Sequence, residues 1–201
     1  MENTVSKTTL GLNLPTDPRW VDLAAMSMQD ILTDHAFCEQ KAASTIISII
    51  QMHSDKPEIV EALSPIVTEE WGHFRMVLAE LKKRGLTLGI QRPDQYIKEL
   101  MKGKPKGTGR DQLFLDQLLI CALIEARSCE RFKILSQQLE EQGLKDFYHQ
   151  FMVAEAAHYK LFLQLAKSFF EEEKVMTRWH YWLDHEAGFL PHLEVRGDRM
   201  H

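Results

Sequence analysis

The sequence contains two glutamate–histidine pairs of identical spacing. Glu70 lies three positions before His73, and Glu155 lies three positions before His158. In a helix this spacing puts both side chains on one face, where a carboxylate and an imidazole can bind one metal ion or bridge two. A single pair of this kind often arises by chance. The prediction of a metal site therefore depends on whether the two pairs belong to a larger pattern.

The larger pattern is an internal repeat. A further glutamate precedes each pair: Glu39 lies 31 positions before Glu70, and Glu125 lies 30 positions before Glu155. Corresponding residues of the two halves are 85 or 86 positions apart. Each half therefore offers one glutamate plus a Glu-x-x-His pair, and the predicted metal ligands are Glu39, Glu70, His73, Glu125, Glu155 and His158.

The cost of burying carboxylates makes a metal the favoured explanation. Glutamate is almost never fully buried unless it is paired, and four carboxylates in one core would cost many kcal/mol or take up protons. Two divalent cations would balance the four charges, and carboxylate plus imidazole without thiolate favours iron or manganese over structural zinc. The alternative is an ordinary bundle with buried Glu–Arg or Glu–His pairs. Arg127 and Arg131 are present, but both point away from the apolar stripe of their predicted helix.

The elements that must position these residues are long amphipathic helices. Apolar residues recur with helical spacing, glycine and proline are sparse and clustered, and each predicted ligand falls within an apolar stripe. Short turns make the long helices pair as two antiparallel hairpins, giving an all-α four-helix bundle over residues 27–173. We expect long helices over 27–53, 57–84, 111–142 and 145–173, and shorter ones starting near Pro18, over 93–101 and over 175–187.

A basic segment connects the two predicted hairpins. Residues 82–110 contain nine Lys or Arg against two acidic residues, while the whole chain has a net charge of −5. The segment therefore carries +7 and the rest of the chain −12, which suggests an anionic partner at one place on the surface. A solvated connecting loop is the alternative. The crossover of residues 85–110 is also long for a compact domain, which is typical of functional loops.

The length and composition exclude several other classes. With 201 residues, 44% of them apolar, the chain is predicted to form one domain over 1–201. No apolar run approaches the roughly 18 residues of a membrane span, and residues 1–15 lack the pattern of a secretory signal. The three cysteines form no C-x-x-C pair and fit a reducing cytoplasm, so we expect a cytoplasmic protein with no membrane partner.

The six-residue pattern resembles that of the ferritin-like di-iron carboxylate proteins, in which two helices give one glutamate each and two give Glu-x-x-His. The resemblance covers residues 27–173 and implies a ferritin-like bundle that binds two iron ions at the six predicted ligands. It identifies the superfamily and not the activity, since related sites serve many reactions.

A closer resemblance comes from the segments around the ligands. The chain resembles the MiaE family of tRNA 2-methylthio-N6-isopentenyladenosine hydroxylases in residues 17–20 (DPRW), 35–43 (HAFCEQKAA), 69–74 (EEWGHF) and 121–132 (CALIEARSCERF). The resemblance implies an O2-dependent monooxygenase. Its substrate would be the isopentenyl side chain of the modified adenosine beside the anticodon of tRNA.

This function implies a pocket, an RNA surface and an electron source. We expect apolar walls from Phe37, Phe74, Phe132 and Phe162, although core packing is the alternative for each. The anticodon stem-loop of tRNA would be held by basic residues of the crossover, in particular Lys102, Lys104, Lys106 and Arg110.

No DNA partner is expected. With no dinucleotide motif and no cluster cysteines, the electron donor is expected to be a separate reductase or electron-transfer protein. The competing functions are an iron-handling ferritin-like protein and a di-manganese catalase or peroxidase.

Overall fold

A computed structural model describes residue 8 and residues 10–200 of the chain. The described residues form helices and no β-strand, as predicted. None of these helices is both long enough and apolar enough to cross a membrane. The elements are α1 (Trp20–Met26), α2 (Met28–Met52), α3 (Pro57–Lys83), α4 (Gln95–Met101), α5 (Arg110–Gln138), α6 (Gln142–Phe169), α7 (Glu172–Phe189) and a 3-10 turn (Leu190–His192).

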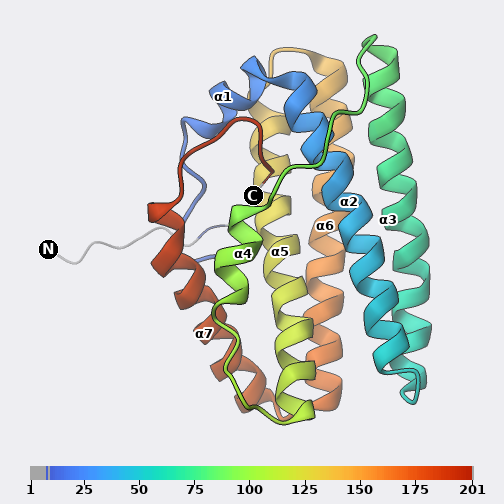
Figure 1. The fold of residues 1–201 in the computed structure, drawn as a ribbon, viewed down its shortest axis with the longest axis vertical. Helices are drawn as coiled ribbons and strands as arrows, with labels where there is room; N and C mark the ends of the chain where they lie inside the picture. The colour runs from blue at the N-terminus through green and yellow to red at the C-terminus, as the bar shows by residue number, and fades with distance from the viewer. Residues whose placement is uncertain (1–7, 9, 201) are drawn as a thin grey trace, which may run out of the picture. The chain divides into compact units, whose positions relative to one another are not determined.

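The chain divides into two compact units. Unit 1 contains the described residues up to Val21 together with residues 94–195, and unit 2 contains residues 22–93 and 196–200. Each unit is built on one long antiparallel hairpin, α5–α6 in unit 1 and α2–α3 in unit 2 (Figure 1). The two hairpins predicted from the apolar stripes are thus present. That the chain forms one domain stays a prediction.

Unit 2 is held together by aliphatic residues along the α2–α3 hairpin. Ile31 and Ile46 of α2 and Leu63 and Val77 of α3 are fully buried or nearly so. A four-residue turn connects the helices, and Pro57 begins α3, where a missing backbone N–H costs no hydrogen bond. The helix ends before Gly85, which adopts a φ of 69° that favours glycine, and the Leu86 amide donates to the Leu81 carbonyl.

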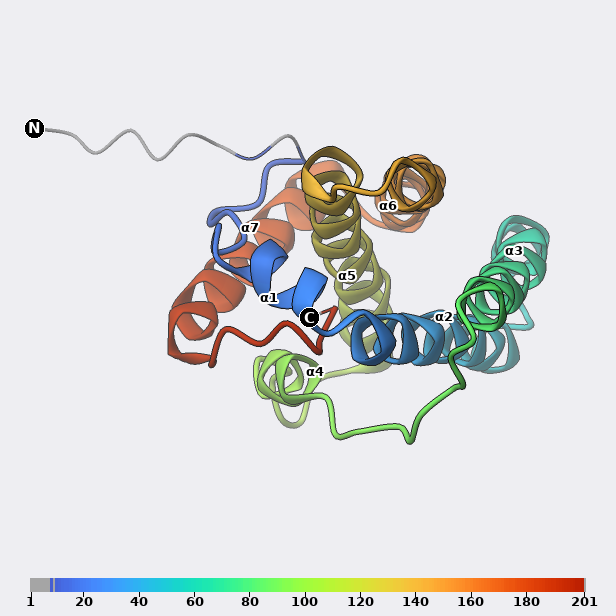
Figure 2. The same cartoon turned by 90° about the horizontal axis from the view of Figure 1, so that it is seen from above.

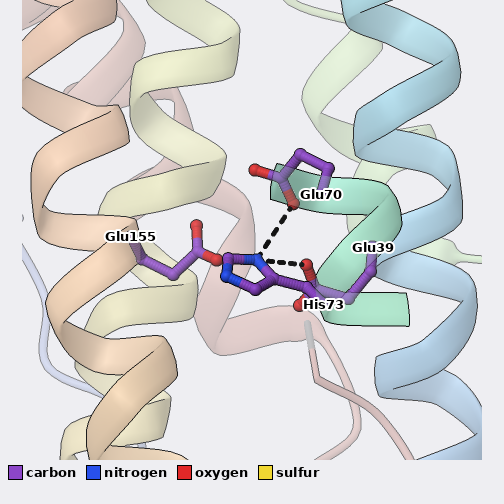
Figure 3. A group of neighbouring side chains, drawn as sticks. All are labelled: Glu39, Glu70, His73 and Glu155. Atoms are coloured by element: carbon purple, nitrogen blue, oxygen red, sulfur yellow. Dashed lines mark ion pairs between the residues drawn. The ribbon is translucent and has the colours of Figure 1, made fainter. Parts of the chain in front are cut away.

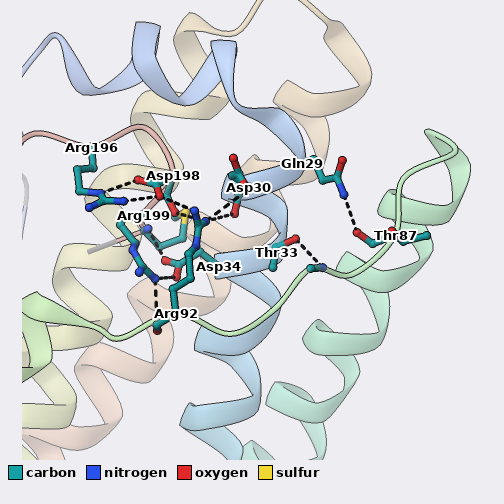
Figure 4. Close-up of polar contacts among 11 residues, drawn as sticks. Gln29, Asp30, Thr33, Asp34, Thr87, Arg92, Arg196, Asp198 and Arg199 are labelled. Carbon is teal, nitrogen blue, oxygen red and sulfur yellow. Dashed lines mark hydrogen bonds and ion pairs between the residues drawn. The ribbon is translucent and has the colours of Figure 1, made fainter.

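The C-terminal strap (residues 196–200) also belongs to unit 2. Arg199 and the Met200 amide donate hydrogen bonds to the two carboxylate oxygens of the buried Asp34, over 2.6 and 2.8 Å (Figure 4). Asp198 accepts a 2.6 Å hydrogen bond from Arg92. A Cβ at Gly197 would lie 2.1 Å from the Leu23 carbonyl carbon, so only glycine fits this close approach. These contacts fix the strap on the start of α2.

Unit 1 packs α5, α6 and α7 around an aromatic interior. Figure 2 shows α5 and α6 side by side, and α7 also contacts both helices. Phe132 packs against Tyr148 and Phe151 at one end of the hairpin, with ring centroids 5.8 and 5.4 Å apart. At the other end Phe114 contacts Phe169 at 5.4 Å.

The turn between α5 and α6 differs from the sequence prediction. The predicted helix continued to Gln142 and stopped at Gly143, whereas α5 ends at Gln138 and α6 already begins at Gln142. Leu139 leaves the helix with an extended backbone and is buried. Because this side chain is buried, α5 ends four residues before its predicted end, and Gly143 lies in the first turn of α6.

A buried ionic network joins α4, α5 and α7 within unit 1. Arg127 and Glu186 are both 0% exposed and form a bidentate pair with distances of 2.9 and 2.8 Å. Tyr96 of α4 donates to Glu186 over 2.7 Å, and Arg127 also pairs with Glu130. Since a buried charge is costly unless it is paired and hydrogen-bonded, these partners explain how α5 can bury an arginine.

Candidate metal-binding half-sites

The first half-site lies in unit 2 on facing turns of α2 and α3. Glu39 comes from α2, and Glu70 and His73 come from one face of α3 (Figure 3). The Nδ1 atom of His73 lies 3.4 Å from a carboxylate oxygen of Glu39 and 3.6 Å from one of Glu70. All three residues are buried, with exposed fractions of 8% or less. Three potential ligand atoms therefore converge at a buried position.

Burial and mutual charge determine the protonation of this half-site. Burial raises the pKa of Glu39 to about 8, because a carboxylate is poorly stabilised away from water. Burial alone would lower the pKa of His73, but its contacts with Glu39 and Glu70 outweigh this effect and raise it to about 10. The two carboxylates thus favour a positive charge between them. A metal cation meets the same requirement.

His35 supports this half-site from one helical turn before Glu39. It is completely buried, and its Nε2 lies 2.8 Å from a carboxylate oxygen of Glu39. Burial, together with the charge of the nearby His73, lowers the pKa of His35 to about 3. A neutral His35 that donates from Nε2 orients one Glu39 oxygen and leaves the other directed at His73.

The second half-site lies in unit 1 on α5 and α6. Glu125 comes from α5, and Glu155 and His158 come from one face of α6. The three side chains are buried, and they offer ligand atoms that lie within 4.8 Å of one another. Glu155, the fourth residue drawn in Figure 3, lies 3.8 Å from His158 Nδ1 through one carboxylate oxygen. This half-site repeats the donor types of the first.

The donor set of each half-site fits a divalent metal. Two buried carboxylates and one imidazole are the ligands that iron and manganese accept, and no thiolate is among them. Both half-sites arise from the same local device: a glutamate in the middle of one helix faces a Glu-x-x-His pair in the middle of its antiparallel partner. Each hairpin therefore carries a buried set of side chains that could hold a metal ion.

The four phenylalanines predicted to form the apolar walls of a pocket differ in burial. Phe132 and Phe162 are buried and Phe37 and Phe74 are half-buried, but Phe132 is part of the aromatic core already described. For Phe132 the core-packing alternative therefore accounts for the burial.

The predicted RNA contacts lie in and beside the loop between α4 and α5. Lys102, Lys106 and Arg110 are exposed and Lys104 is half-buried. Lys102 forms a 2.6 Å ion pair with Glu99, whereas no carboxylate in the described part of the chain pairs with the other three. Sequence reasoning missed Tyr181 of α7, whose hydroxyl donates to the Gly103 carbonyl of this loop. Nothing in the sequence signals this contact, since it joins positions 78 residues apart.

Comparisons with known proteins agree on one family. A family model described as tRNA-(MS2IO6A)-hydroxylase (MiaE) matches residues 3–201. A tRNA 2-(methylsulfanyl)-N(6)-isopentenyladenosine(37) hydroxylase of Pseudomonas putida is 34% identical, over 82% of this chain and 78% of its own length. A hydroxylase of the same name from Salmonella typhimurium is 25% identical, over 92% of this chain and 86% of its own length.

A solved structure shows the same fold. A Synechococcus protein described as having aldehyde deformylating oxygenase activity matches with a TM-score of 0.89 and 33% identity, over 94% of both chains. This similarity confirms the predicted all-α, ferritin-like fold class. The family model, the two hydroxylase relatives and the half-sites lead to one conclusion: the chain belongs to the MiaE family of tRNA-modifying hydroxylases.

Proposed function

We propose that this protein is an O2-dependent monooxygenase that hydroxylates the isopentenyl side chain of 2-methylthio-N6-isopentenyladenosine, next to the anticodon in tRNA. The observation that carries the proposal is the buried glutamate plus Glu-x-x-His set, present once in each hairpin of a chain that a tRNA hydroxylase family model matches over residues 3–201. The enzyme acts in the cytoplasm.

Two iron ions are the proposed cofactors. The ligands that would hold them are Glu39, Glu70, His73, Glu125, Glu155 and His158. When bound, the iron supplies the O2 activation that insertion into an unactivated C–H bond requires. The reaction takes one oxygen atom of O2 into the new hydroxyl group and reduces the other to water. It therefore consumes two electrons and two protons, which a separate reductase or electron-transfer protein supplies.

The chain's own residues prepare this chemistry by burial and charge. In each half-site two carboxylates are buried, and their negative charge stabilises a cation there. His35 holds one oxygen of Glu39 in place over 2.8 Å and leaves the other oxygen directed at His73. Helix interiors rather than loops carry all six ligands, so the side chains are held on rigid elements.

Lys102, Lys104, Lys106 and Arg110 are the proposed contacts to the tRNA anticodon stem-loop. Replacing Lys102, Lys104 and Lys106 together by alanine should weaken tRNA binding, and each lost phosphate contact should reduce the slope of log affinity against log salt by about 0.7–0.9. The matched control replaces the same three lysines by arginine, which keeps the charge and should keep the slope. An unchanged affinity and slope in the alanine variant would exclude these lysines.

Nucleoside analysis of tRNA tests the proposed function in the cell. Cells lacking this protein should accumulate the unhydroxylated nucleoside, and the wild-type gene should restore the hydroxylated form. A gene carrying Glu125→Ala should not restore the hydroxylated form, even when the variant protein is present at the wild-type level. Normal levels of the hydroxylated nucleoside without the protein would refute the substrate assignment.

Aldehyde deformylation is a second candidate, favoured by the similarity to the Synechococcus protein at 33% identity over 94% of the chain. Two assays distinguish these activities. The same iron-loaded preparation, with the same reductant, is incubated first with tRNA and then, separately, with an aldehyde. Hydroxylated nucleoside without loss of aldehyde supports the tRNA substrate, and the opposite result supports the aldehyde.

A further inference from the structure

The loop between α4 and α5 is held rigidly on α7. We call residues 102–110, which include Arg110 at the start of α5, the basic loop. The Tyr181 hydroxyl donates a 2.6 Å hydrogen bond to the Gly103 carbonyl, and His185 Nε2 lies 3.1 Å from the Glu99 carbonyl just before the loop. Both partners come from α7, one helical turn apart, so this helix fixes the backbone at the start of the loop.

Gly103 permits this attachment by having no side chain. A Cβ built at this position would lie 2.6 Å from a ring carbon of His185 and 2.8 Å from the ring of Trp182. Any other residue at this position would displace the His185 or Trp182 side chain, or the loop itself. The aromatic side chains beneath are themselves fixed, because Trp182 is fully buried and its indole N–H donates to Asp116 over 2.9 Å.

The fixed backbone presents unneutralised charge to solvent. Lys104, Lys106 and Arg110 have no carboxylate partner among the described residues, and Lys106 and Arg110 are exposed. By contrast, the nearby open pocket of about 530 Å³ beside Tyr181 is lined by two cationic and two acidic side chains and is nearly neutral. In this part of unit 1, the net positive charge therefore lies on the basic loop and not in the pocket. An anionic polymer could therefore bind these side chains with little cost in ordering the loop backbone.

The position of the loop along α5 indicates which part of an RNA it contacts. Arg110 precedes Glu125 by fifteen residues of continuous helix, which corresponds to roughly 22 Å along the axis. A nucleoside reacting at Glu125 is therefore too far away for the loop to surround it. Phosphates of the helical stem lie at such distances from a loop nucleoside, and phosphate contacts position an RNA without reading its sequence.

We propose that α7, through Tyr181, His185 and the space at Gly103, holds the basic loop as a preformed binding surface for the phosphate backbone of the tRNA stem. This inference rests on the proposed function, because it takes tRNA as the substrate. Tyr181 is a positioning residue that acts through the loop lysines. The loop contributes to affinity for the RNA stem and not to the chemical step.

The test is a double-mutant cycle in binding of an unreacted tRNA transcript. Tyr181→Phe removes one hydroxyl, and loss of one hydrogen bond should weaken binding roughly fivefold. Lys104→Ala with Lys106→Ala should weaken binding further and lower the salt slope by about 1.4–1.8. If Tyr181 acts by positioning the lysines, adding Tyr181→Phe to the lysine variant should change nothing more.

Two controls keep the test specific. Tyr159→Phe removes a hydroxyl that donates to the Leu10 carbonyl elsewhere in unit 1, and it should leave tRNA affinity unchanged. Thermal unfolding and metal content should be the same in all variants, which excludes general damage. A trimmed RNA that keeps the anticodon loop but lacks the stem should bind wild type and the lysine variant equally.

Several results would overturn the inference. If wild type binds tRNA but Tyr181→Phe binds it equally well, or if the Tyr181 and lysine effects add independently, α7 does not position the loop. If the lysine variant binds tRNA normally and instead loses affinity for an acidic electron-transfer protein, the loop serves that partner. Failure of the wild-type protein to bind any tRNA would refute the proposed function itself, which distinguishes the two failures.

Discussion

At the scale of single residues, the geometry of the first half-site depends on the neighbours that orient Glu39. Glu39 has one oxygen near His35 and the other near His73, so it is oriented before any metal is bound. Partners that hold a ligand in this way typically change metal affinity by about 10–100-fold when they are removed.

Replacing His35 by alanine should therefore weaken metal binding by about 10–100-fold, measured by competition with a chelator. His35→Gln can still donate to Glu39 and should restore most of the affinity, which a simple packing defect would not allow. His149→Ala, at an exposed histidine of α6, is the control. Equal metal affinity in wild type and His35→Ala would show that His35 does not position Glu39 for metal binding.

Replacing Glu125 by alanine should prevent loading of two metal ions per chain, since the second half-site then keeps only one carboxylate. Metal analysis after reconstitution with excess Fe(II) measures the stoichiometry, with Glu173→Ala, at an exposed glutamate of α7, as the control. The same analysis on protein from cells distinguishes iron from manganese. Full loading of Glu125→Ala would mean that another carboxylate is the ligand.

At the scale of helices, the buried pair of Arg127 and Glu186 holds α7 on α5. Removing one partner leaves a buried charge uncompensated, so Glu186→Ala should lower the free energy of unfolding by about 3–5 kcal/mol. Chemical denaturation measures the loss, and Glu173→Ala should lose less than about 0.5 kcal/mol. A similarly small loss for Glu186→Ala would mean that Arg127 reaches other partners or solvent.

Much of the helical organisation could be predicted, because apolar periodicity depends on local spacing. The long helices and the Glu-x-x-His faces of α3 and α6 follow directly from positions three and four apart. The end of α5 could not be predicted, because burial of Leu139 depends on residues distant in the chain. The same limit applies to Tyr181 and Gly103: a side chain bonded to a backbone carbonyl 78 residues away leaves no pattern in the sequence. The six metal ligands remain a prediction, which is supported by the burial of the side chains and the closeness of their ligand atoms in each half-site.

At the scale of the whole chain, the last residues return to the first hairpin. The C-terminal strap binds Asp34, the residue just before His35, so the start of α2 is tied to residues 196–200. Asp198 has a lowered pKa, mainly because Arg196 donates hydrogen bonds to its carboxylate, with Arg92 and Arg199 adding favourable charge (Figure 4).

This pKa predicts how the strap responds to pH. A carboxylate with a lowered folded-state pKa contributes stability above its unfolded pKa of about 3.8, and that contribution is lost as the pH falls through the folded value. The protection of residues 196–200 against hydrogen exchange, measured relative to the intrinsic exchange rate at each pH, should therefore be high at neutral pH and should fall below about pH 4. Asp198→Asn should exchange faster at neutral pH and show a weaker pH response. Slow exchange in this variant at all pH values would show that Asp198 does not hold the strap.

One reaction with defined components tests whether the protein is an O2-dependent tRNA hydroxylase. Iron-loaded protein, a chemical or protein reductant, and tRNA carrying the unhydroxylated nucleoside are exposed to isotopically heavy O2, and the nucleosides are analysed by mass spectrometry. We expect a hydroxylated side chain that carries the heavy oxygen with the wild-type protein and not with Glu125→Ala. Fully iron-loaded protein that leaves the nucleoside unchanged, or a hydroxyl group whose oxygen comes from water, would contradict the proposed function.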